Sequence, residues 1–328
     1  MTLEDVILID GNLRPIWRFF LSTVLVFLTY VGAYLLAGEV RDLMPRAAAW
    51  YGSFFLLQLL AFLGSFKIMT RVFEQKPLGV VGLAFHPYWG KELCVGLGIG
   101  GIMIVSVGGA EALLALARYA RNPLPAGVEL AYGSGMFLLL FISATNEELV
   151  FRGYPFQKLV ESLGPPGAVA VSSACFGLAH LGNSHHTWIS TVNTMLVGVP
   201  LSIAYLRTRS LWMPVGIHFA WNYVQGFVFG LPVSGFTFPT TLLNPRVHGG
   251  EWLTGSAYGP EGGLLCTIAA LGAGTFLFLS PRIRMSGTMR ELVYGPLPML
   301  PPARQFTFRR DPTLGRRDRI RCAARTPG

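Results

Sequence analysis

The fold class is decided by the stretch Gly135-Met-Phe-Leu-Leu-Leu-Phe-Ile-Ser-Ala-Thr-Asn-Glu-Glu-Leu-Val-Phe-Arg152, an apolar segment that ends in two adjacent carboxylates. Each ionised acid near the middle of a bilayer costs roughly 2.5–3.5 kcal/mol. Glu148 and Arg152 are four residues apart, so on a helix they share one face and can pair. Glu147 points about 100° away from Glu148. The spacing therefore predicts a structural, paired Glu148 and a free Glu147.

The composition is that of a polytopic membrane protein. Of the 328 residues, 52% are hydrophobic and 13% are charged, whereas soluble domains carry about 25% charge. We predict an all-α transmembrane helix bundle of about eight spans, with a membrane domain at 1–280 and a catalytic core at about 133–280. The predicted spans are Ile16–Leu36, Ala47–Phe66, Leu93–Leu116, Gly133–Phe151, Gly167–Leu181, Ile189–Tyr205, Leu211–Phe229 and Gly263–Ser280.

The basic residues are distributed unevenly between the two sides of this bundle. If the spans alternate in direction, 21 of the 26 Lys and Arg fall on the side that holds both termini. Basic residues collect on the cytoplasmic side of membrane proteins, so both termini are predicted to be cytoplasmic. Acidic Glu4, Asp5 and Asp10 stand where a signal peptide would be basic, so the first span is expected to remain as an anchor. The oligomeric state does not follow from the sequence.

The segment 281–328 is basic and rich in proline and arginine. It accounts for much of the net charge of +9. Next to a membrane, such a tail favours contact with anionic lipid headgroups over nucleic acid, and its composition predicts disorder. Cys94, Cys175 and Cys266 fall inside predicted spans and are expected to be buried free thiols, while Cys322 lies in the tail.

Two further polar motifs follow in later spans, Phe176-Gly-Leu-Ala-His180 and His218-Phe-Ala-Trp-Asn222. His218 and Asn222 are four apart and share a helix face. If the fourth span stays helical to Lys158, Glu147 lies roughly 16 Å from its end, and His180 and His218 lie roughly 20 and 10 Å along their own spans. We therefore expect the polar side chains to meet at one depth in the membrane.

Several chemistries are open to such a cluster. A Glu and a His that meet can hold and deprotonate a water, and a second His with an amide can stabilise an oxyanion, which together describe amide hydrolysis. A zinc site assembled from Glu147, His180 and His218 is the alternative that uses a metal. A lone intramembrane His is also a common helix-packing group, and Phe176 is expected to be a packing residue. His185 and His186 fit a helix end at the interface.

The three motifs resemble those of the CAAX-protease and bacteriocin-processing (CPBP) intramembrane proteases, which include the Ras-converting CAAX endopeptidases. That family carries Glu-Glu-x-x-x-Arg, Phe-x-x-x-His and His-x-x-x-Asn, and the chain has all three in this order. The resemblance implies that Glu147 and His180 activate water and that His218 and Asn222 form the oxyanion site. It also implies that Glu148 and Arg152 organise the site. It assigns no role to His185 and His186.

The predicted function is therefore an intramembrane endopeptidase that acts on a membrane-associated or prenylated substrate. The flanking sequences resemble bacterial members, which implies a bacterial cytoplasmic membrane. Two alternatives remain open at this point. The chain could be a non-enzymatic immunity or adaptor protein on the same scaffold, or it could form a proton or ion pathway, since intramembrane Glu and His also build relays.

Overall fold

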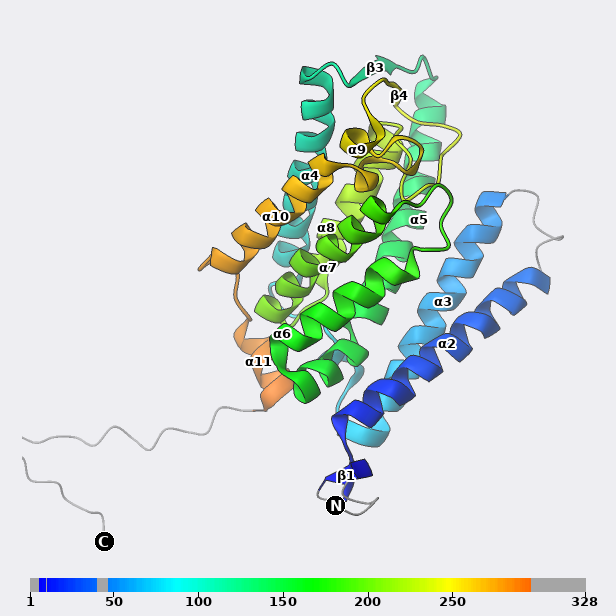
Figure 1. The fold of residues 1–328 in the computed structure, drawn as a ribbon. Coiled ribbons are helices and arrows are strands. Elements are labelled where there is room, and N and C mark those ends of the chain that lie inside the picture. The colour runs from blue at the N-terminus through cyan, green and yellow to red at the C-terminus, as the bar shows by residue number, and fades with distance from the viewer. Residues whose placement is uncertain (1–5, 10, 40–46, 296–328) are drawn as a thin grey trace, which may run out of the picture.

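The computed structural model describes residues 6–9, 11–39 and 47–295, and there the chain forms a bundle of long helices (Figure 1). The all-α, polytopic fold class is confirmed. The helices of the bundle are α2 (Pro15–Glu39), α3 (Ala47–Met69), α4 (Trp89–Leu113), α5 (Ala126–Arg152), α6 (Tyr154–Ala179), α7 (Trp188–Thr208), α8 (Trp212–Tyr223) and α10 (Leu264–Leu279). Each of the eight predicted spans thus coincides with a helix.

Five stretches among the described residues are long and apolar enough to cross a membrane. One of them joins α5 to α6, and the others contain α2, α3, α4 and α7. Helix α8 is short and continues into a π-helix, η4 (Val224–Val228), while α10 is apolar but has only 16 residues. Length and composition alone therefore identify fewer spans than the eight that we predicted.

Two small sheets and several short turns lie at the ends of the bundle. The sheet of β3 (Ala117–Arg121) and β4 (Leu243–Val247) is antiparallel and lies at the upper end in Figure 1. The ribbon of β1 (Leu8–Ile9) and β2 (Asn12–Leu13) lies at the opposite end, which α11 (Gly287–Tyr294) shares. The remaining elements are η2 (Thr70–Glu74), η3 (Leu78–Val81), α9 (Glu251–Thr254), η5 (Ser256–Tyr258) and η6 (Pro260–Gly262).

The helix that carries the two glutamates ends earlier than expected. Gly153, with φ −77° and ψ −136°, breaks the chain between α5 and α6, so the assumption of a continuous helix to Lys158 is wrong. Helix α6 then kinks at Gly164, where φ is +72°. Glycine adopts this left-handed conformation without steric cost, and the two prolines that follow cannot donate helix hydrogen bonds. The fifth span therefore begins at this kink.

Helix α11 corrects part of the prediction for the tail. Gly287–Tyr294 lies in the segment expected to be disordered, yet it is helical. The hydroxyl of Ser286 caps it by accepting a hydrogen bond from the amide of Met289 at 3.2 Å. Lys76 Nζ also donates to the carbonyl oxygen of Val293 at 2.7 Å, which ties the helix to the segment after α3. Residues 296–328, which include Cys322 and most of the arginines of the 281–328 tail, lie outside the described residues.

Helices α4 and α8 approach each other closely through glycines. A Cβ atom on Gly96 would overlap the carbonyl oxygen of Met213, and one on Gly100 would overlap that of Ile217. On the other side of the contact, a Cβ on Gly216 would lie 2.6 Å from the carbonyl oxygen of Leu93. Small residues at such spacing let helix backbones pack tightly in membranes. This contact fixes the depth and rotation of α8, the helix that bears His218.

The three cysteines in the bundle differ in their environment. Cys266 on α10 is fully buried, as predicted. Cys94 on α4 and Cys175 on α6 are exposed on the helix surface, so the prediction of buried thiols is wrong for these two. In a membrane span, an apolar residue can satisfy the hydrophobic requirement by facing lipid instead of protein, and the sequence does not distinguish the two.

Candidate active site

Glu148 and Arg152 form a completely buried pair on α5. Arg152 Nη1 lies 3.2 Å from Glu148 Oε1, and neither side chain has any exposed surface. Arg152 Nη2 also donates to the carbonyl oxygen of Gly198 on α7 at 3.1 Å. Its guanidinium lies over the ring of Phe176, 4.4 Å from the ring centroid. Phe176 is thus a packing residue, as expected, and it packs against the charge of the pair.

His218 connects α8 to the same carboxylate. Its Nδ1 lies 2.8 Å from Glu148 Oε1. A carboxylate accepts hydrogen bonds, so the geometry assigns the proton to Nδ1 and leaves Nε2 facing the other glutamate. Glu148 Oε1 therefore accepts from both Arg152 and His218, and the sequence spacing indicated only the contact with Arg152.

His180 is held by the end of its own helix. It is the residue that follows α6, and its Nδ1 lies 2.7 Å from the carbonyl oxygen of Phe176. A carbonyl oxygen can only accept, so Nδ1 carries the proton and Nε2 presents a lone pair. The position of α6 is fixed by Gly177, where a Cβ would lie 2.8 Å from the carbonyl oxygen of Thr191 on α7.

Glu147 lies between the two histidines and is bonded to neither. Its Oε2 is 3.7 Å from His180 Nε2 and 3.8 Å from His218 Nε2. This oxygen is buried and has no hydrogen-bond partner among the described residues. Unlike Glu148, the side chain is 30% exposed. Glu148 Oε2 also lacks a partner, but it is the unpartnered oxygen of Glu147 that two imidazole nitrogens approach, from helices distant in sequence.

The charges of this cluster can balance within the membrane. With both glutamates ionised, Arg152 compensates one negative charge and a proton on one imidazole compensates the other. Buried charges are costly unless they are paired. His218 is the imidazole better placed to carry this proton, since it faces both carboxylates. As an imidazolium, it donates from Nδ1 to Glu148 and has a second N–H to offer from Nε2.

A small cavity of about 40 Å³ adjoins the cluster. A water needs roughly 10–15 Å³ of such volume, so the cavity has room for at least one. Asn222 lines it one helical turn beyond His218 on α8, so the structure brings all four residues of the two later motifs to one place. The lining residues are Met103, Phe176, His180, Thr194, Val197, Leu201, Ile217, His218, Trp221, Asn222, Ser234 and Glu261.

Glu261 is the cavity residue that sequence reasoning missed. It lies in η6, 39 residues after Asn222, in a loop that the hydropathy pattern placed outside the membrane. Burial raises the pKa of its carboxyl from 4.5 to about 7. The signal that could have found it is the run Gly259-Pro-Glu-Gly-Gly263, in which an acid sits among glycines directly before an apolar span.

His185 and His186 lie apart from this cluster. Both are exposed in the loop between α6 and α7. His186 Nδ1 lies 3.3 Å from the carbonyl oxygen of Asn183, and His185 adopts φ +60°. Their placement agrees with the interfacial interpretation and gives them no contact with Glu147.

A metal ion would require several side chains of the cluster to converge on one point. Among the described residues, no group of three or more His, Cys, Asp or Glu side chains could hold a metal ion. Glu147, His180 and His218 come nearest, and both imidazoles are oriented through Nδ1 as metal-binding histidines are. Zinc ligands lie about 2.0–2.2 Å from the ion. Two ligands of one such ion lie about 3.4 to 3.8 Å apart, so the separations of 3.7 and 3.8 Å fit an ion as well as a bridging water.

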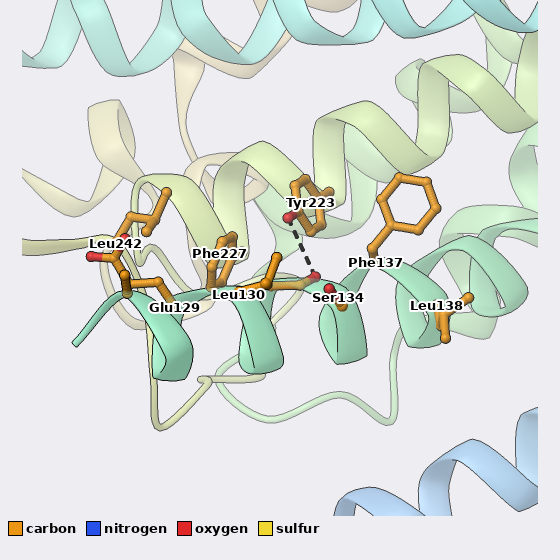
Figure 2. A pocket seen from close by; sticks show the side chains of 10 residues that line it. Glu129, Leu130, Ser134, Phe137, Leu138, Tyr223, Phe227 and Leu242 are labelled. Carbon is orange, nitrogen blue, oxygen red and sulfur yellow. Dashed lines mark hydrogen bonds between the residues drawn. The ribbon is translucent and has the colours of Figure 1, made fainter. Parts of the chain in front are cut away.

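A second, larger hollow of about 610 Å³ lies on the side of α5 nearer its start. Figure 2 shows Phe137, Tyr223 and Phe227 along it, with Tyr223 donating a hydrogen bond to the backbone of α5. The acceptor is the carbonyl oxygen of Gly133 at 3.3 Å. The lining is mostly apolar and open to the surroundings of the helix, and it does not include any residue of the glutamate and histidine cluster.

The fold and this cluster define a polytopic membrane protein with a buried polar centre shared by α5, α6 and α8. Residues 131–224 match the family described as Rce1-like, type II CAAX prenyl endopeptidase Rce1-like. The match contains all seven residues of the three motifs and agrees with the family that they indicated. This segment is similar to CAAX-protease domains, and Glu261 lies beyond it. Comparison with curated proteins and with solved structures gave no match.

Proposed function

We propose that the protein is an intramembrane endopeptidase in which Glu147 activates the attacking water. The observation that supports this most directly is the convergence of Glu147 Oε2 with two imidazole nitrogens at 3.7 and 3.8 Å. Atoms at this separation leave room for one water at about 2.8 Å from each. The family match gives the reaction class, since the family comprises CAAX prenyl endopeptidases.

The two histidines then take different roles, which follow from their Nδ1 partners. Neutral His180, fixed by the carbonyl of Phe176, accepts a hydrogen bond from the water through Nε2 and orients it. Glu147 removes a proton as the water oxygen attacks the peptide carbonyl carbon. General base catalysis of this kind contributes about 10²- to 10⁴-fold.

His218 and Asn222 are the donors for the oxyanion. His218 donates one hydrogen bond from Nδ1 to Glu148 and a second from Nε2 to the oxyanion. Asn222 offers its side-chain amide to the oxyanion from the next turn of the helix. Removing one such donor costs about 10²- to 10³-fold in kcat. Glu148 and Arg152 act through His218, because they hold its ring and its proton in place. They are positioning residues in this scheme.

The substrate is a peptide at the membrane, and a prenylated peptide is the variant that the family description favours. Assays with a farnesylated CAAX peptide and with the same peptide lacking the lipid would separate the two substrate classes. We place the enzyme in a bacterial cytoplasmic membrane with both termini in the cytoplasm. Reporter fusions at residue 1 and after Tyr294 are expected to give cytoplasmic signals.

The decisive experiment compares Glu147→Gln with the unmodified protein in detergent or liposomes. We expect peptide hydrolysis to fall by at least about 10³-fold, since the base is lost. His180→Ala should fall to a similar level. If Glu147→Gln cleaves at the original rate, the proposed mechanism is wrong. A cellular phenotype that survives both substitutions would support the immunity or adaptor alternative, and ion flux without hydrolysis would support a pathway.

Metal involvement is tested separately. We derive no step through a metal and expect hydrolysis to persist after dialysis against a chelator. Loss of activity that added Zn²⁺ restores would assign Glu147, His180 and His218 to a metal instead.

A further inference from the structure

Glu261 brings a third carboxylate to the candidate site from outside the family-matched segment. It is 6% exposed and lines the same small cavity as His180, His218 and Asn222. Glu261 has no part in the roles assigned to Glu147, His180, His218 and Asn222. A buried acid that lines a cavity able to hold water, next to two imidazoles, has the placement of a group that exchanges protons.

The two oxygens of this carboxyl group are held unequally. Oε2 accepts a hydrogen bond from Gln225 Nε2 at 2.6 Å. Oε1 has longer contacts, 3.3 Å to the amide and 3.4 Å to the hydroxyl of Ser234, which is itself a cavity residue. The side chain of Trp221 also forms a hydrogen bond with the carboxyl group. One oxygen is thus anchored, and the other is available to carry a proton toward the cavity.

The loop around Glu261 is built to hold it in one position. At Gly259, with φ +100°, a Cβ atom would overlap the carbonyl oxygen of Pro232, and at Gly263 one would overlap that of Leu253. Asn193 on α7 donates to the carbonyl oxygens of Glu261 and Gly263 at 2.9 and 2.8 Å. Backbone packing this close leaves the carboxyl little freedom to turn away from the cavity.

We propose that Glu261 is the general acid of the peptidase, which supplies the proton that the leaving amine requires. This inference rests on the proposed function. In the reaction, water forms the new C–O bond and gives a proton to Glu147. The C–N bond breaks as protonated Glu261 donates through a cavity water to the amine nitrogen. The proton on Glu147 then returns through water to Glu261, which restores both groups.

The surroundings of Glu261 suit this role near neutral pH. Burial raises the pKa of Glu261 to about 7, so the group is partly protonated under physiological conditions. The titratable groups that face it are His180 and His218 across the cavity, Tyr258 from η5 and Cys266 from α10. The residues of α4 and α7 at the cavity carry no charge.

The test is the pH profile of kcat for Glu261→Gln, with Glu111→Gln as the matched control. Glu111 is also a buried acid, bonded to Tyr119 at 2.7 Å, but it does not line the cavity. We expect the activity of the unmodified protein to decline above about pH 7. Glu261→Gln should lower kcat by about 10²- to 10³-fold and remove this decline. Glu111→Gln should keep both rate and profile.

A second variant guards against a folding defect in Glu261→Gln. Gln225→Met leaves the acid in place but removes a hydrogen bond that favours its ionised form, so the alkaline decline should move to higher pH. If the alkaline decline is unchanged in both variants, the inference is overturned, even if kcat falls. Inactive Glu147→Gln alongside that result would leave the proposed peptidase intact, whereas active Glu147→Gln would reject the peptidase mechanism itself.

Discussion

Nδ1 of His218 lies 2.8 Å from Oε1 of Glu148, so a histidine of α8 shares the carboxylate that also binds Arg152 on α5. The carboxylate of Glu148 therefore forms a salt bridge within α5 and also holds the imidazole of His218 on α8. Arg152 Nη1 lies 3.2 Å from Glu148 Oε1, and the same oxygen accepts a hydrogen bond from Nδ1 of His218.

Glu148→Gln should reduce both activity and stability. The amide cannot hold His218 as an imidazolium, and groups that orient a functional histidine typically contribute about 10- to 100-fold. Arg152 would also be left buried without its counter-charge, at about 3–5 kcal/mol. Steady-state kinetics and thermal unfolding in detergent measure the two effects. Glu161→Gln is the control, since that acid is half-exposed beside Lys158 and should cost less than about 1 kcal/mol.

Arg152→Lys should be damaging although it keeps the charge. An ammonium can still pair with Glu148, but it cannot at the same time reach the carbonyl of Gly198 and lie flat over Phe176. We expect a loss of about 1–3 kcal/mol in unfolding free energy. Arg152→Met, which leaves the carboxylate unpaired, should cost more, about 3–5 kcal/mol. If Arg152→Lys were as stable as the unmodified protein, the shape of the guanidinium would be unimportant.

Gly100→Ala should impair the enzyme from outside the cluster. The added methyl group would push against the backbone of Ile217, the residue before His218. Overpacking of this kind costs about 1–3 kcal/mol, and movement of α8 should lower kcat. Gly101→Ala is the control on the same helix, because no atom lies within 4 Å of its Cβ position. That variant should be unchanged or slightly more stable, since Ala favours helix over Gly.

The stability of the protein should depend on pH through Glu261. Its carboxyl pKa is about 7 in the folded protein and about 4.5 in the unfolded chain. Between these values the folded state binds the proton more tightly, so stability is greatest below about pH 4.5 and falls as the pH rises to 7. The difference amounts to about 3 kcal/mol. Melting temperatures across this range should show a smaller pH dependence in Glu261→Gln than in the unmodified protein.

The sequence predicted the helices well because each span had to satisfy its backbone hydrogen bonds internally. The predicted end of the helix that carries the two glutamates was wrong. The break at Gly153 and the kink at Gly164 depend on local backbone conformation, which the apolar pattern does not record. The order in α11 depends on contacts with distant Lys76 that a composition rich in arginine and proline does not reveal.

The sequence motifs singled out the residues of the Glu147 cluster, but they predicted only some of the contacts between them. Helical spacing was enough to pair Glu148 with Arg152 and to leave Glu147 free. It could not show that Glu148 also serves His218, because that bond joins residues 70 positions apart. Glu261 escaped notice for the same reason, since only the folded loop brings it to the cavity wall.

The glycine contact between α4 and α8 has a consequence for attempts to shorten the protein. All seven motif residues lie within 131–224, which suggests a convenient minimal fragment. Yet the depth of His218 is set by Gly96 and Gly100, which lie before that segment. A fragment beginning at residue 131 would therefore carry every motif side chain but lack α4, the helix that positions His218 and Asn222. Transplanting the chemistry to another scaffold requires α4 as well.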